Sequence, residues 1–185
     1  MEEINRNIDD NEILIRIIFS PKHYSRSNKK FHYNEIFVPY KGGVSLNRYK
    51  YSNENLSKKQ GLAMENLNFR YKGVVLFKKK MIFSELENYL SSTNRKNLDI
   101  EIRATPLDEK EKIIPEGTKV FTTDKGNPSH ADIIYSPEHI PSSEPRKARA
   151  FSKYFAKALE RENLLILDSN PEEKLWSEKE FISYF

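Results

Sequence analysis

Residues 13–19, with the sequence ILIRIIF, constrain the fold of this chain more than any other segment. Six of the seven side chains are apolar, four of them are isoleucine, and Pro21 follows shortly after the run. A β-branched run without polar alternation is typical of a strand that is buried in a sheet. We therefore expect this segment to form a buried, central strand.

Other segments have weaker strand patterns. Residues 98–103 alternate apolar and charged side chains, as in a strand with one face in the core and the other in water. Residues 44–51, 73–77 and 130–135 are also expected to be strands. The run EIFVPY, residues 35–40, is a candidate edge strand, because its proline cannot donate a hydrogen bond within a sheet.

The clearest helix begins near Pro145, which suits a first helical turn. At 100° per residue, apolar side chains gather on one side of it and basic side chains on the other. The apolar set is Ala148, Phe151, Phe155 and Leu159, and the basic set is Arg146, Arg149, Lys153 and Lys157. Weaker helices are expected at residues 56–67, after a capping box formed by Ser84 and Glu87, and after Ser177.

These elements mix strands and helices without strict βαβ alternation, which favours an α+β fold. With 185 residues, the chain has the length of one domain. We expect a single compact domain over residues 1–185 with a mixed or antiparallel sheet and a helical C-terminal part over residues 142–185. Residues 1–11 are a candidate flexible segment at the start of this domain.

Composition and motifs exclude several classes of function. The chain has no cysteine, so thiolate zinc sites, iron–sulfur clusters, disulfides and cysteine nucleophiles are absent. Glycine-rich phosphate loops and the common hydrolase and metalloprotease signatures are also missing. The sequence indicates no metal site and identifies no cofactor. An acidic start and the lack of an 18-residue apolar run favour a cytoplasmic protein without membrane contact.

Charge is distributed unevenly along the chain. The net charge is +4, yet residues 21–60 hold nine basic and two acidic residues, and residues 145–161 hold six basic and one acidic residue. The rest of the chain is therefore net acidic. Clustered basic residues create a positive local potential, which attracts anionic partners more strongly than the net charge suggests.

The first functional hypothesis follows from this charge pattern. The basic helix side, together with Lys29, Lys30 and Arg48, would bind nucleic acid or another polyanion. Aromatic residues lie between the basic ones in residues 21–60, which favours single strands, because unpaired bases stack on aromatic rings. Two alternatives remain open: an ordinary solvated helix with aromatic core residues, and a subunit that docks an acidic protein.

A second hypothesis concerns the segment GNPSHADI, residues 126–133. In a strand, His130 and Asp132 point to the same side and could act together as an acid–base pair on a nucleotide or phosphorylated substrate. The alternative is that Asp132 caps or hydrogen-bonds the preceding turn, while His130 is a structural histidine whose hydrogen bonds are satisfied. Arg16, inside the central strand, must either be paired or line a polar cleft, because an unpaired buried charge is costly. The sequence does not decide whether the protein is an enzyme.

Overall fold

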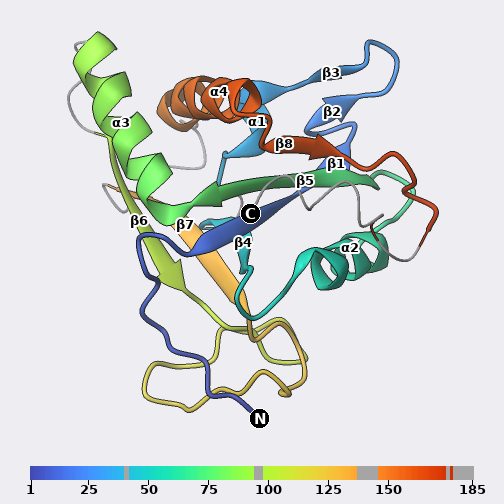
Figure 1. The fold of residues 1–185 in the computed structure, drawn as a ribbon, viewed down its shortest axis with the longest axis vertical. Helices are drawn as coiled ribbons and strands as arrows, with labels where there is room; N and C mark the ends of the chain where they lie inside the picture. The colour runs from blue at the N-terminus through green and yellow to red at the C-terminus, as the bar shows by residue number, and fades with distance from the viewer. Residues whose placement is uncertain (40–41, 94–97, 137–145, 174–175, 177–185) are drawn as a thin grey trace.

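The computed structural model describes residues 1–39, 42–93, 98–136, 146–173 and 176 (Figure 1). In these residues the strands are β1 (Ile13–Ser20), β2 (Tyr24–Ser25), β3 (Lys30–Phe31), β4 (Val44–Arg48), β5 (Arg70–Lys78), β6 (Asp99–Ala104), β7 (His130–Ser136) and β8 (Leu165–Leu167). The helices are α1 (Tyr33–Ile36), α2 (Glu54–Ala63), α3 (Lys79–Thr93) and α4 (Arg146–Arg161).

The main sheet has six strands in the order β6-β7-β4-β1-β5-β8, and every neighbouring pair is antiparallel. Strands β2 and β3 form a separate two-stranded hairpin. The protein is a single compact α+β fold, as the sequence predicted, and the sheet is antiparallel rather than mixed.

The isoleucine-rich segment is β1, and it lies inside the sheet between β4 and β5. Leu14 and Ile18 pack into a core that α4 covers, whereas Ile15 and Ile17 pack on the opposite face, where α2 lies (Figure 1). Because both faces of the strand are buried, the pattern has no polar alternation. The prediction of a buried, central strand is confirmed.

Two elements near α4 differ from the sequence prediction. The residues of EIFVPY that the structure describes do not form a strand: the segment begins inside the short helix α1, which buries Ile36 completely. Helix α3 begins at Lys79, directly after β5, so Ser84 lies inside the helix and does not cap it. The sequence pattern also predicts that Leu86, Tyr89 and Leu90 face inward in this helix. Leu86 and Tyr89 are buried and Leu90 is half-buried, because helical periodicity is independent of where the helix begins.

The remaining helix predictions have mixed outcomes. The weak helix expected at residues 56–67 is α2, which begins earlier and ends sooner. Its start is capped by Asn53, whose side chain accepts a hydrogen bond of 3.0 Å from the backbone N–H of Leu56. The C-terminal part contains the short strand β8 in addition to α4. The helix predicted after Ser177 lies outside the described residues.

Residues 1–11, for which flexibility was considered, make specific contacts instead. Ile4 and Ile8 are buried, and the backbone N–H of Ile4 donates a 2.8 Å hydrogen bond to the carbonyl of Val120. This contact joins the start of the chain to the long connection between β6 and β7 (Figure 1). In the part of the chain that the structure describes, no helix is both long and apolar enough to cross a membrane.

Candidate functional site

The basic side of α4 is exposed, as the sequence predicted. The exposed cations are Arg146, Arg149, Lys153 and Lys157, with Lys147 and Arg161 at the two ends of the helix. The opposite side is buried through Ala148, Phe151, Ser152, Phe155, Ala156, Ala158 and Leu159. The helix is therefore held on the sheet by its apolar side, and its basic side faces solvent.

Helix α1 connects this helix to the basic N-terminal segment. The hydroxyl of Ser152 donates a 2.6 Å hydrogen bond to the carbonyl of Tyr33 and accepts one of 2.9 Å from the backbone N–H of Phe37. The Nζ atom of Lys157 lies 5.7 Å from the centroid of the Tyr33 ring, within the range of a cation–π contact. The two basic segments are thus neighbours in space, which the sequence could not show.

The hairpin β2–β3 extends this surface. Its exposed cations are Arg26, Lys29 and Lys30, and Lys29 adopts a left-handed conformation with a φ of 50° in the turn. The ring of Phe31 in β3 lies 5.3 Å from that of Tyr24 and 6.1 Å from that of Tyr33. A row of aromatic rings therefore leads from the hairpin to α4.

We define the basic surface as Arg26, Lys29, Lys30, Arg146, Arg149, Lys153 and Lys157. Two acidic side chains lie on it. Glu35 pairs with Arg149 at 3.0 Å, and Glu160 accepts a 2.8 Å hydrogen bond from the Tyr33 hydroxyl. Burial and this hydrogen bond raise the pKa of Tyr33 to about 12. In the described part of the chain, Arg149 is the one cation of the seven that is paired with a carboxylate.

Arg48 does not belong to this surface, and its prediction as a nucleic-acid contact is wrong. Its side chain is 1% exposed and forms a two-pronged ion pair with Glu12, at 2.5 Å from Nε and 2.8 Å from the second guanidinium nitrogen. The guanidinium also donates hydrogen bonds to the carbonyls of Asn5 and Asn7. Arg48 therefore fastens the N-terminal segment to β4 and is not accessible to a ligand.

His130 and Asp132 lie on the same side of β7, as period two predicted, and Thr105 joins them. The Nδ1 atom of His130 lies 2.9 Å from the carbonyl of Thr105, and the Thr105 hydroxyl donates a 2.8 Å hydrogen bond to Oδ2 of Asp132. A carbonyl can only accept a hydrogen bond, so Nδ1 carries the proton. Thr105 follows β6 and His130 begins β7. These hydrogen bonds therefore join the two ends of the long connection between β6 and β7.

This geometry does not support the acid–base role expected of His130. The His130 side chain is 9% exposed, and burial lowers its pKa, although the neighbouring Asp132 carboxylate partly offsets that effect. The ring nitrogen that carries the proton is already bonded to Thr105. The arrangement favours the alternative of a structural histidine, because Nδ1 of His130 is bonded to the carbonyl of Thr105. No group of three or more potential metal-ligating side chains occurs in the described residues.

Arg16 is paired with backbone rather than with a carboxylate. Its half-buried guanidinium donates hydrogen bonds of 3.2 Å to the carbonyl of Ile36 and of 2.9 Å to that of Ser45. Burial lowers its pKa to about 10, and the charge of Asp132 acts in the opposite direction. The arginine therefore remains charged at neutral pH and links β1 to α1 and β4.

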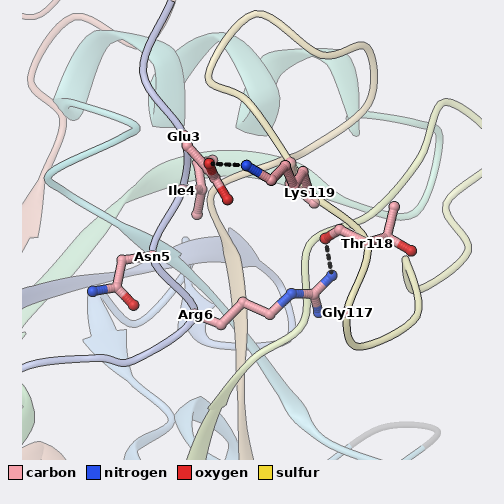
Figure 2. Close-up of a pocket in the computed structure, with 8 residues that line it drawn as sticks. Glu3, Ile4, Asn5, Arg6, Gly117, Thr118 and Lys119 are labelled. Atoms are coloured by element: carbon pink, nitrogen blue, oxygen red, sulfur yellow. Dashed lines mark hydrogen bonds and ion pairs between the residues drawn. The ribbon is translucent and has the colours of Figure 1, made fainter.

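A cavity of about 500 Å³ lies between the N-terminal segment and the connection from β6 to β7 (Figure 2). Arg6 lines it, but its guanidinium donates to the carbonyls of Ile114, Pro115 and Thr118. Glu3 pairs with Lys119 at 3.2 Å. These polar groups hold the two segments together, so the cavity offers little to a ligand.

His23 is a buried base that the sequence analysis did not single out. It is 1% exposed, and its Nδ1 accepts a 3.1 Å hydrogen bond from the backbone N–H of Phe19. Burial, followed by the positive charges of Arg16, Lys22 and His32, lowers the pKa of His23 well below its usual value. The imidazole is therefore neutral in the folded protein at pH values where it is charged in the unfolded chain.

The stability of the protein should consequently fall as the pH drops below about 6.5, the usual histidine pKa. There the unfolded chain binds a proton that the folded protein excludes, which costs roughly 1.4 kcal/mol for His23 between pH 7.5 and 5.5. Urea unfolding at both pH values measures the loss. His23→Asn keeps an acceptor for Phe19 and cannot titrate, so it should reduce the pH dependence by about that amount; an unchanged dependence would contradict the assignment.

Comparisons with protein-family models, with curated proteins and with solved structures find no match to this chain. The functional interpretation therefore rests on the residues themselves. Some of the residues around the basic surface were missed from sequence. Glu35 pairs with Arg149 and so links the two basic segments, and it lies in helix α1 although the pattern of residues 35–40 favoured an edge strand. Arg70 and Lys72 belong to β5, which begins at Arg70, three residues before the strand expected from the sequence at residues 73–77.

Proposed function

We propose that the protein binds polyanions, with single-stranded nucleic acid as the preferred ligand, through the basic surface. One observation carries the proposal: α1 brings exposed cations from two segments more than 100 residues apart in sequence onto neighbouring elements. Neighbouring cations can contact successive phosphates of one strand, and each contact releases bound counterions.

Aromatic side chains favour single strands over duplex. Phe31 and Tyr33, whose ring centroids lie 6.1 Å apart, are half-buried residues between the hairpin and α4. Unpaired bases can stack on such rings, and stacking contributes roughly 1–3 kcal/mol for each base. A duplex would offer its phosphates but not its base faces.

Charge reversal on both segments should weaken this binding strongly. Lys30→Glu with Lys153→Glu changes one exposed cation on β3 and one on α4. We expect affinity for a 20-nucleotide oligo(dT) at 50 mM salt to fall by at least about tenfold, and the slope of log K against log salt to become shallower by roughly 1.4, because single strands contribute about 0.7 for each phosphate contact. Fluorescence anisotropy over a salt series measures both quantities.

The matched control is Lys59→Glu with Lys110→Glu, which has the same charge change on α2 and on the connection between β6 and β7, away from the basic surface. This variant should bind nearly as the wild type does, because distant charges act only through the screened field. Absence of wild-type binding at 50 mM salt, or equal losses in the two variants, would refute the proposal. Equal competition by poly-L-glutamate would favour an acidic protein partner.

A further inference from the structure

A second depression lies beside the hairpin, at the edge of the sheet. It has a volume of about 660 Å³, within the range of about 300–1,000 Å³ that small-molecule sites occupy. Its walls come from the hairpin, from the start of β5 and from the chain that follows β8. These three parts lie on the same side of the view in Figure 1.

Cations dominate the lining of this depression. Arg26 and Lys29 contribute from the hairpin, and Arg70 and Lys72 contribute from β5. The acidic lining residues are Glu65 and Glu172, so four positive charges face two negative ones. A phosphate monoester carries close to two negative charges at neutral pH, which matches this excess.

The pocket is partly organised without a ligand. Glu65 accepts hydrogen bonds from the backbone N–H of Tyr71 at 2.9 Å and from the guanidinium of Arg70 at 3.3 Å, which holds the arginine at the edge of the pocket. Lys72 is half-buried, and its backbone carbonyl accepts a 2.9 Å hydrogen bond from Asp168. Less solvent around a cation reduces screening and strengthens its attraction for an anion.

We propose that this pocket binds a phosphate monoester, through Arg26 and Lys29 on one wall and Arg70 and Lys72 on the other. The phosphate could belong to a free nucleotide or to the 5′ end of a strand that lies on the basic surface, since the hairpin borders both sites. Binding of a strand's 5′ end rests on the proposed function, whereas binding of a free nucleotide does not.

The experiment compares ligands that differ only by the phosphate. Isothermal titration calorimetry measures 5′-AMP against adenosine, and anisotropy measures a 5′-phosphorylated oligo(dT) against its 5′-hydroxyl form. Lys72→Gln removes one pocket cation outside the basic surface, and Lys78→Gln is the control, because Lys78 is exposed at the far end of the same strand. A lost charge-assisted contact should weaken phosphate binding by about tenfold or more.

Each outcome is decisive. Binding of AMP but not adenosine, weakened in Lys72→Gln and not in Lys78→Gln, supports the pocket with a free nucleotide as ligand. A preference only for the 5′-phosphorylated oligonucleotide, lost in Lys72→Gln, supports it with a strand end as ligand. No phosphate preference, or equal behaviour of the two variants, overturns it. If AMP binds and no oligonucleotide does, the basic-surface proposal fails while the pocket stands.

Discussion

Replacement of Glu12 by alanine is expected to destabilise the protein by about 3–5 kcal/mol, because it leaves the buried Arg48 guanidinium without its counter-charge. Both side chains of the pair are almost completely buried, at 1% exposure for Arg48 and 8% for Glu12. Solvent screens a charge at such a buried site only weakly. The two remaining carbonyl acceptors, at Asn5 and Asn7, carry only partial charges.

Urea unfolding followed by circular dichroism measures the effect. Glu101→Ala is the matched control: it removes another arginine–glutamate pair, with Arg103 at 2.8 Å, in which both side chains are about half exposed. An exposed pair contributes roughly 0–1 kcal/mol, so the two variants should differ clearly. The double variant Glu12→Leu with Arg48→Met should recover much of the loss. A loss below about 1 kcal/mol in Glu12→Ala would show that the N-terminal segment is held by other contacts.

Replacement of Asp168 by alanine should be comparably severe, at about 3–5 kcal/mol. Lys58 of α2 is 0% exposed, and its Nζ lies 2.7 Å from Oδ2 of Asp168, which is itself 1% exposed. Nζ also donates a 3.0 Å hydrogen bond to the carbonyl of Asn170 and lies 5.4 Å from the ring of Trp176. Without the Asp168 carboxylate, the buried ammonium group of Lys58 would lose the counter-charge that lies 2.7 Å from it.

That tryptophan provides a local measurement. Trp176 is the one tryptophan of the chain and is 6% exposed, so its emission reports on this contact. Asp168→Ala should shift the emission to longer wavelength and lower the urea midpoint. Lys58→Met with Asp168→Leu removes both charges together and should restore most of the stability. An unchanged spectrum and midpoint in Asp168→Ala would disprove the structural importance of the pair.

Both predictions concern charges whose environment the sequence did not reveal. Arg48 and Lys58 stand in a basic stretch and resemble the exposed lysines around them. Their partners Glu12 and Asp168 lie 36 and 110 residues away. Sequence periodicity does not predict a pairing between residues so far apart. A count of basic residues therefore overestimated the number of exposed cations available for binding.

Local patterns predicted what depends on neighbours along the chain. The period of α4 separated its buried side from its basic side, the unbroken apolar run predicted the central position of β1, and period two placed His130 and Asp132 on one side of β7. These features follow from backbone geometry alone, which repeats at fixed intervals.

The sequence by itself therefore determined the fold class, the buried strand and the amphipathic helix. Only the tertiary structure decided which cations remain exposed, that α1 joins the two basic segments, and that the imidazole of His130 is enclosed. The physical reason is that exposure and pairing depend on contacts between residues distant in sequence, whereas periodicity depends only on the local conformation of the backbone.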